Sequence, residues 1–274
     1  MIRKQKLTKA ALARQLGISR ASLYYVSKQM PKDWALKLRI EEVLREHPGY
    51  GYPRIALTLG VNKKRAHRVM KLFGMKAYRR RGRRPYKTYH SKIEYPNLLK
   101  TIIPTGPHHV WAADFTFLPY QGRFLYLSTV IDLFTRETVG WSVMMNHSVP
   151  LVLQSLFAAT QHHPRPVIFH SDNGREYGSK IFTRALSELG INISRSAKSS
   201  PWENGYQESF YSQFKIDLGD PDRFRSLGEL VYEIHRLVWD YNHKRIHSVL
   251  KMPPLLFANR YQKLLEKQSY VWGY

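Results

Sequence analysis

The 274-residue sequence contains no cysteine, which excludes disulfide bonds and cysteine-based zinc sites. It also contains no apolar run approaching the roughly 18 residues that a transmembrane helix needs. The N-terminal stretch is basic but has neither the apolar segment nor the cleavage site of a secretory signal. These absences predict a cytoplasmic protein.

Acidic residues are scarce in the first third of the chain. Residues 1–100 hold 26 Lys and Arg against 5 Asp and Glu, whereas residues 101–274 hold 18 against 15. The first hundred residues therefore carry a net charge of +21 (26 − 5) and the remainder only +3 (18 − 15). A merely solvated surface would not segregate charge so strongly, so the pattern predicts a polyanionic partner, namely double-stranded DNA.

Two short helices are predicted within residues 7–28, one on each side of Gly17. Thr8 can cap the first helix and Ser19 the second. This spacing is typical of a helix-turn-helix over residues 1–30, although a plain helical hairpin would give a similar pattern. The residues expected to face DNA include Arg20 and Tyr24.

A second helix-turn-helix unit is predicted over residues 31–78. Its helices are expected at 34–47, 54–59 and 61–70, with Asn62 as the cap of the third. That third helix is strongly basic, as a recognition helix would be, and its cations would mostly grip phosphates. The expected DNA-binding residues here are Lys63, Lys64, Arg65 and Arg68.

Residues 79–100 are predicted to be a basic linker. The segment 78–87 has no hydrophobic period and contains six Lys and Arg, which suits a minor groove or a phosphate track as well as a plain connection. The arginines expected to contact DNA are Arg79, Arg80, Arg81, Arg83 and Arg84.

Strand patterns begin after Pro104. Three strands, a helix, a strand, a helix, a strand and a helix are expected in that order, which is the order of a ribonuclease H-like fold. The predicted α/β catalytic core, with a mixed five-stranded sheet, spans 101–222, and a helical extension spans 223–274. The expected elements are 110–118, 124–131, 137–143, 149–162, 167–171, 179–189, 191–194 and 201–218, followed by a helix at 227–241, with Met252-Pro253-Pro254 ending regular structure.

Three acids occupy matching positions in this order. Asp114 lies on the first predicted strand, Asp172 at the end of the fourth, and Glu208 on the helix that follows the fifth. Carboxylates with no thiol among them favour Mg²⁺. Two ions could activate the attacking oxygen and stabilise the leaving oxygen at a phosphodiester, with Asp114 bridging both. Alone, Asp172 would be read as a turn residue and Glu208 as a surface residue.

Polar residues around the last of these acids are further candidates. The stretch 194–200 is small and polar and is expected to be a mobile loop that becomes ordered on DNA. Its cations, and polar groups on the following helix, are predicted to meet DNA. These residues are Arg195, Lys198, Asn204, Gln207 and Lys215.

The motifs around the three acids resemble the DDE transposases of bacterial insertion sequences, specifically the OrfB-type protein of the IS-three family, and more distantly retroviral integrases. The phrases that carry the resemblance are WAADFT, LSTVIDLFTRETVGW, FHSDNGREYGS, SPWENGYQESFYSQFK and YNHKRIHSVLKMPP, with ARQLGISRASLYY and HPGYGYPRI earlier in the chain. The likeness covers nearly the whole sequence.

The resemblance implies a transposase that binds terminal inverted repeats, cleaves DNA and transfers strands with two Mg²⁺ ions, for which Mn²⁺ would substitute. It also implies a nucleoid-associated protein acting as a homodimer or higher synaptic oligomer on element and target DNA. No leucine zipper is visible, so an upstream OrfA-type partner is a further candidate. The alternatives are a DNA-binding regulator and a structure-specific nuclease without transfer activity.

Overall fold

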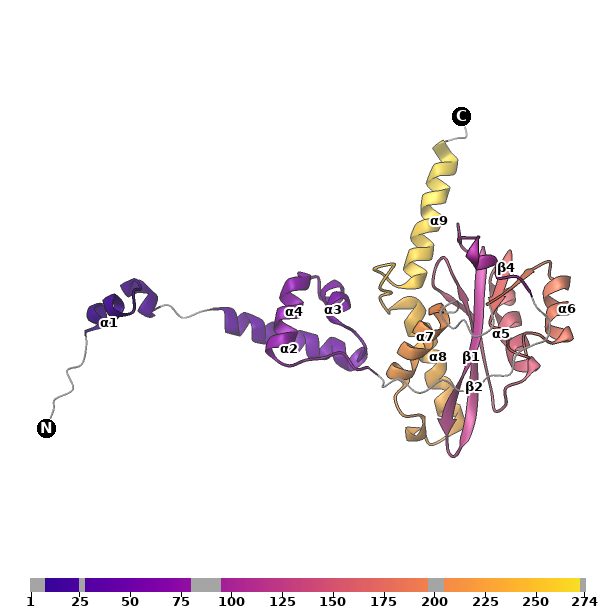
Figure 1. Cartoon of the computed structure of the whole chain (residues 1–274), viewed down its shortest axis with the longest axis horizontal. Helices are drawn as coiled ribbons and strands as arrows, with labels where there is room; N and C mark the ends of the chain where they lie inside the picture. The colour runs from indigo at the N-terminus through magenta and orange to yellow at the C-terminus, as the bar shows by residue number, and fades with distance from the viewer. Residues whose placement is uncertain (1–7, 25–27, 80–94, 197–204, 272–274) are drawn as a thin grey trace.

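The computed structural model describes residues 8–24, 28–79, 95–196 and 205–271 (Figure 1). Two sets of short helices precede a sheet that is covered by helices, and a long C-terminal helix follows. Within these described ranges, no helix combines the length and the apolar character that crossing a bilayer requires.

The first helical unit begins with α1 (Lys9–Gln15). Thr8 caps it as predicted, because its side chain accepts a hydrogen bond from the Ala11 N–H. Gly17 has a positive φ of 64°, and Ser19 accepts from the Ser22 N–H. The second predicted helix is a 3₁₀-helix, η1 (Arg20–Tyr24), in the part of the chain described here.

The second helical unit contains α2 (Gln29–Glu46), α3 (Tyr52–Leu59) and α4 (Lys63–Leu72). Asn62 caps α4 as predicted, accepting from the Lys64 N–H. All three helices face one hydrophobic cluster, whose most buried members are Ile40, Ile55 and Val69. The unit thus has its own small core.

The catalytic half is built on one mixed five-stranded sheet with the order β3-β2-β1-β4-β5. β1 pairs antiparallel with β2 and parallel with β4, which places β1 at the centre. This topology confirms the predicted ribonuclease H-like fold. The strands are β1 (Val110–Tyr120), β2 (Arg123–Asp132), β3 (Thr138–Met144), β4 (Ile168–Ser171) and β5 (Asn192–Arg195).

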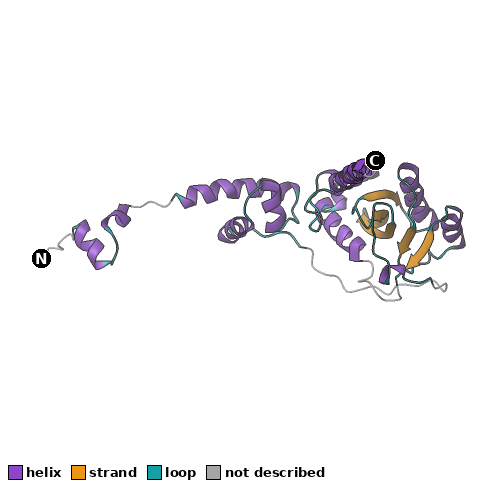
Figure 2. Ribbon diagram, turned by 90° about the horizontal axis from the view of Figure 1, so that it is seen from above, coloured by secondary structure: helices purple, strands orange, loops and turns teal. Residues whose placement is uncertain are grey.

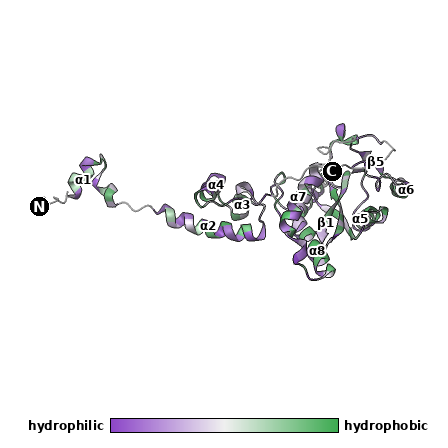
Figure 3. Ribbon diagram, turned by 60° about the horizontal axis from the view of Figure 1, so that its bottom comes forward, coloured by the Kyte–Doolittle hydropathy of each residue, from purple (hydrophilic) through white to green (hydrophobic). Residues whose placement is uncertain are grey.

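Helices lie on both sides of the sheet (Figure 2). One hydrophobic cluster joins β1 and β2 to α7 (Gly205–Leu218) and α8 (Leu227–His243). A second joins the sheet to α5 (Val149–His162) and α6 (Lys180–Glu188). Figure 3 shows hydrophobic residues along β1, α5 and α8. Since α8 shares a core with α7, the proposed boundary at residue 222 does not separate two hydrophobic cores.

The sheet and α5 approach each other most closely at Gly140 on β3. A Cβ atom there would lie 2.4 Å from the Ser155 carbonyl oxygen and 2.7 Å from Ala159 Cβ. Backbone atoms of a packed helix cannot yield this space cheaply, so the position requires glycine.

The expected end of regular structure at Met252-Pro253-Pro254 is wrong. Pro254 instead begins α9 (Pro254–Val271). The reason is that proline suits the first turn of a helix, where its missing N–H has no helical partner. The described chain also contains the short 3₁₀-helices η2 (Leu98–Lys100) and η4 (Pro221–Arg223).

The turn before α3 joins the second helical unit to the catalytic half. A Cβ at Gly49 would lie 2.7 Å from Gln213 Oε1 on α7, so the backbone there passes very close to that helix. Tyr50, 1% exposed, accepts a hydrogen bond at its hydroxyl from the Ile246 N–H at 2.8 Å. Ile246 also packs against the core of the second unit. The Gly-Tyr pair therefore docks the two parts together.

Candidate active site

The two aspartates are neighbours because of the register between β1 and β4. Ala113 on β1 pairs with Ser171 on β4 in parallel orientation. Asp114 and Asp172 each follow directly on this pair, at the point where β4 ends. Residues paired in parallel register lie side by side, so Asp114 within β1 and Asp172 just after the end of β4 lie in one region of the sheet.

The first turn of α7, which carries Glu208, is anchored to the same part of the sheet by Gln207. The Gln207 amide donates to the Ala112 carbonyl at 2.7 Å and to the Thr129 carbonyl at 3.3 Å, and its oxygen accepts from the Thr129 hydroxyl at 3.0 Å. Gln207 is completely buried. Glu208, the next residue, is exposed in the first turn of the helix.

Two more residues on the same face of α7 continue this contact along β1. The Tyr211 hydroxyl donates to the Asp114 carbonyl oxygen at 2.6 Å, and the Lys215 ammonium donates to Thr116 Oγ1 at 2.5 Å. Positions four apart on a helix share a face, so this helix lies along β1 beside Asp114. Lys215 also lies 5.1 Å from the centre of the Phe117 ring.

The electrostatics of Asp114 show that the three acids influence one another. Burial raises the pKa of the Asp114 carboxyl well above its usual value, and the charges of Asp172 and Glu208 raise it further. A hydrogen bond from the Phe115 N–H at 2.8 Å and the charge of Lys215 act in the opposite direction. Ionised Asp114 is therefore disfavoured by its burial and its acidic neighbours, and a bound divalent cation would favour the ionised form.

The acids are not gathered into a preformed metal cage. Among the described residues, no three His, Cys, Asp or Glu side chains lie in an arrangement that could hold a metal ion. The convergence of all three acids on a metal therefore stays a prediction. Their chemistry, oxygen donors without thiols, nevertheless fits Mg²⁺.

Asp172 also has the turn role that was its alternative interpretation. Its Oδ1 accepts from the Gly174 N–H at 3.0 Å, which shapes the Asp-Asn-Gly turn. Asp132 is structural: it is fully buried and accepts from the N–H groups of Phe134 and Thr135.

Several predicted DNA-binding residues lie exposed on the N-terminal units. Arg68 is also exposed, but its guanidinium donates two hydrogen bonds of 2.6 Å to the buried carboxylate of Asp33. Arg68 therefore also holds α4 against α2. The other exposed candidates are Arg20, Tyr24, Lys63, Lys64, Arg65 and Arg79.

Two of the predicted DNA-binding residues are buried in this structure. Arg195 is 2% exposed and ends β5, where its guanidinium donates to the Tyr177 carbonyl at 2.6 Å and stacks on Tyr95. Gln207 is buried in the contacts described above. Composition alone did not indicate that both side chains satisfy carbonyl groups inside the fold. The predicted loop 194–200 accordingly begins as a strand.

The remaining candidates lie outside the described residues. They are Arg80, Arg81, Arg83 and Arg84 of the linker, together with Lys198 and Asn204 before α7.

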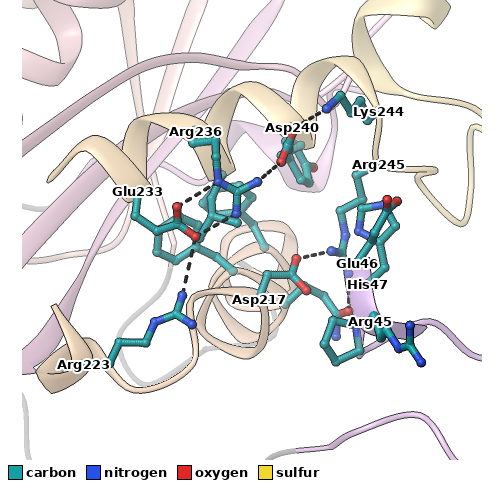
Figure 4. A pocket seen from close by; sticks show the side chains of 16 residues that line it. Arg45, Glu46, His47, Asp217, Arg223, Glu233, Arg236, Asp240, Lys244 and Arg245 are labelled. Carbon is teal, nitrogen blue, oxygen red and sulfur yellow. Dashed lines mark hydrogen bonds and ion pairs between the residues drawn. The ribbon is translucent and has the colours of Figure 1, made fainter. Parts of the chain in front are cut away.

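Sequence reasoning missed a network of charges between the second unit, α7 and α8 (Figure 4). Arg236 pairs with Glu233 at 2.7 Å and with Asp240 at 2.5 Å, and Arg245 pairs with Asp217. The signal available was the spacing of three and four residues between Glu233, Arg236 and Asp240 on α8. The polar stripe of Gln207, Tyr211 and Lys215, at a spacing of four, could likewise have revealed the anchor of α7.

Comparison with known proteins agrees with this geometry. Residues 104–201 match the family described as Integrase core domain, and residues 189–254 match a second family of the same description. These ranges contain all three acids.

Curated relatives extend the match over most of the chain. The transposase for insertion sequence element IS904 of Lactococcus lactis subsp. lactis (strain IL1403) is 36% identical over 82% of this chain and 93% of its own length. The putative transposase InsK for insertion sequence element IS150 of Escherichia coli (strain K12) is 33% identical over 91% and 93%. The magnesium-bound catalytic core domain of HTLV-2 integrase is 18% identical, with a TM-score of 0.47 over 56% of this chain and 98% of that one.

The fold and the sequence matches define an enzyme of the DDE polynucleotidyl transferase class. Within that class, the chain belongs to the transposases of bacterial insertion sequences of the IS-three type.

Proposed function

We propose that the chain binds the terminal inverted repeats of its own mobile element and catalyses DNA cleavage and strand transfer with Asp114, Asp172 and Glu208. The observation that supports this most directly is the β1–β4 register, which places two aspartates side by side, together with the anchoring of α7 beside them. The family supplies the reaction class, DNA transposition and integration.

The three carboxylates would hold two Mg²⁺ ions, or Mn²⁺ in their place. When bound, such ions stabilise the charge on the attacking and leaving oxygens of a phosphodiester. In this proposal Asp114, Asp172 and Glu208 would supply the carboxylate oxygens that hold the ions. Tyr211 and Gln207 position α7 so that Glu208 stays within reach.

DNA is held by the basic N-terminal units in this proposal. Lys63, Lys64 and Arg65 are exposed on α4, with Arg20 and Tyr24 on the first unit and Arg79 at the start of the linker. These groups would contact mainly phosphates. The proposed assembly is a homodimer or larger oligomer on paired ends, with an upstream OrfA-type protein as a candidate partner.

The test is an end-joining assay with labelled end DNA, target DNA and Mg²⁺. Asp114→Asn, Asp172→Asn and Glu208→Gln should each abolish joining while leaving retardation of the DNA intact. Glu188→Gln is the matched control, because Glu188 is an exposed acid on α6 that pairs with Arg184. Normal joining by any of the three variants would contradict the role of that residue.

The two alternative functions give different products in the same assay. A nuclease would yield nicked DNA without joined products, and a regulator would retard DNA without changing it. Joined products that disappear in all three acid variants distinguish the transposase from both.

A further inference from the structure

A second cavity, of about 370 Å³, lies where the second helical unit, the β2–β3 turn and the segment after α8 meet. Its lining includes three arginines, Arg54 from α3, Arg136 from the turn and Arg245 from the segment after α8, and no Asp or Glu among the described residues. This differs from the neighbouring cavity of Figure 4, where acidic and basic side chains are paired. Asp217 binds Arg245 from outside the lining of the second cavity and so offsets part of its positive charge.

Arg136 has spare hydrogen-bonding capacity in this cavity. Its Nε and Nη1 atoms are out of solvent and have no hydrogen-bond partner in the described structure, although its guanidinium stacks 4.1 Å from the centre of the Tyr206 ring. Its backbone has a φ of 65°, in the left-handed region that non-glycine residues rarely adopt. Buried donors without acceptors are costly, so this arrangement suits a ligand that accepts hydrogen bonds.

The other two arginines are held in place by neighbours. Arg54 and Arg245 both donate to Gln213 Oε1, at 3.4 Å and 2.6 Å, and both lie over the Tyr50 ring, at 5.5 Å and 5.2 Å from its centre. Gln213 and Tyr50 are the residues that dock the second unit onto α7. The cations are therefore fixed at that junction.

His247 adds a neutral donor to the same cavity. Its Nδ1 accepts from the Val249 N–H at 3.3 Å, which leaves the proton of the neutral ring on Nε2. Burial, followed by the charges of Arg136, Arg54 and Arg245, lowers the pKa of His247 to about 4. The ring therefore stays neutral at pH 7 in a strongly positive environment.

We propose that Arg54, Arg136 and Arg245 form a pocket for one backbone phosphate of the DNA, held at the junction between the second helical unit and the catalytic core. Guanidinium groups suit this ligand, because their planar forks donate to phosphate oxygens. Tyr206 and Ser209, which flank Gln207 and Glu208 on α7, line the same cavity. The bound strand would thus pass close to the helix that carries the third acid. The inference rests on the proposed function in taking DNA as the ligand.

The first experiment measures DNA affinity of the full chain as a function of salt for Arg136→Gln and for Arg184→Gln. Loss of one phosphate contact should lower the slope of log affinity against log salt by about 0.9 and weaken binding about tenfold at low salt. Arg184 is the matched control, because it is 80% exposed on α6 and pairs with Glu188. Arg54→Gln should reproduce the effect from the other side of the pocket.

The second experiment locates the phosphate with duplexes that carry a single uncharged methylphosphonate at successive positions. At one position the substitution should weaken binding by the wild-type chain and have no effect on Arg136→Gln. Equal slopes for wild type, Arg136→Gln and Arg54→Gln, each with an unchanged thermal midpoint, would overturn the proposal. A second result would also overturn it: inorganic phosphate at constant ionic strength raises the thermal midpoint of the wild type only, while the salt slope of DNA binding is the same for wild type and variants. A small phosphate compound would then be the ligand.

The outcome is separate from that of the proposed function. Asp114→Asn tests the chemistry and should leave the salt slope unchanged, whereas Arg136→Gln tests the phosphate contact and should change it. If joining depends on the three acids but the slopes are equal, the pocket fails and the transposase function stands.

Discussion

Gln207 shows how one buried side chain can position a reacting group. Its three hydrogen bonds tie the first turn of α7 to both β1 and β2. Replacing this buried amide by a smaller group would remove one hydrogen bond each from two carbonyls and a hydroxyl inside the fold.

We therefore expect Gln207→Ala to lower the free energy of unfolding by about 1–3 kcal/mol. It should also reduce the rate of end joining, because Glu208 is the next residue, while DNA retardation stays normal. Denaturant unfolding and the joining assay measure the two effects. Gln262→Ala is the control, since Gln262 is exposed on α9. Joining at the wild-type rate by a destabilised Gln207→Ala would contradict the positioning role.

Glu137 gives a prediction of pH dependence. Burial, followed by the charge of Asp132, raises the pKa of the Glu137 carboxyl to about 7. The folded state therefore favours the protonated form. The associated stability is fully present below the unfolded pKa near 4.5 and is lost as pH rises to about 7.

Glu137→Gln should remove this dependence, because glutamine is neutral at every pH. At pH 8 the variant should be more stable than wild type by up to about 3 kcal/mol, whereas at pH 4 the two should agree closely. Urea unfolding at both pH values measures the difference. If the free energies of unfolding of Glu137→Gln and wild type differed by the same amount at pH 4 and pH 8, the Glu137 carboxyl would not titrate in this range.

At the level of single residues, the sequence predicted some positions well and others badly. Asp114 and Asp172 could be placed near each other because strand order and the parallel crossover put the end of the fourth strand beside the middle of the first. The burial of Arg195 could not be predicted, because a charged side chain is expected to face solvent. Its guanidinium instead donates to the Tyr177 carbonyl, 18 residues earlier in the chain. A buried cation bound to a backbone carbonyl leaves no pattern in composition.

At the level of elements, local patterns were sufficient where they were strong. The helix at 149–162 was predicted with the bounds that the structure shows, since its apolar face has a clear helical period. The Pro253-Pro254 pair predicts the end of regular structure, whereas α9 begins at Pro254. Proline is compatible both with the residues that follow a helix and with the first turn of the next helix, so the pair does not distinguish the two.

Gly140 provides a test of packing between two elements. Gly140→Ala should destabilise the fold by about 1–3 kcal/mol, because α5 would have to move away from β3. Gly228→Ala on α8 is the control: its Cβ would meet only Ser226 Oγ at 3.8 Å, so stability should not fall. Thermal unfolding compares the two. Equal midpoints for both variants would mean that the contact between α5 and β3 can relax.

At the level of the whole molecule, the uneven charge predicts how DNA is bound. Replacing Lys63, Lys64 and Arg65 together by Gln should lower the slope of log affinity against log salt by up to about 2.7, which is about 0.9 for each phosphate released. Arg68 is left unchanged because it binds Asp33 and so supports the fold of the second unit. Filter binding over a range of salt measures the slope.

The control for this variant is the triple replacement of Lys263, Arg260 and Lys267 on α9, which should leave the slope unchanged. If the α9 variant lowered the slope of log affinity against log salt more than the α4 variant did, the main DNA contact would lie on α9 and not on α4.

The contact between the second unit and the catalytic half is the feature that no local pattern predicts. Tyr50 and Ile246 are 196 positions apart in sequence. Each segment taken alone resembles a turn followed by a polar stretch. Their pairing arises only when the folded surfaces meet.

This docking fixes the distance between the second helical unit and the catalytic half. If α4 reads the element end and the acids cut it, the Tyr50–Ile246 contact fixes the distance between the sequence that is read and the bond that is cut. Inserting about five base pairs between the two, half a turn of B-DNA, would rotate the scissile bond to the far side of the duplex, whereas inserting about ten would restore its face but not its distance. Under the proposed function, the ends of the element would have to keep a constant spacing between the bound sequence and the cleaved bond.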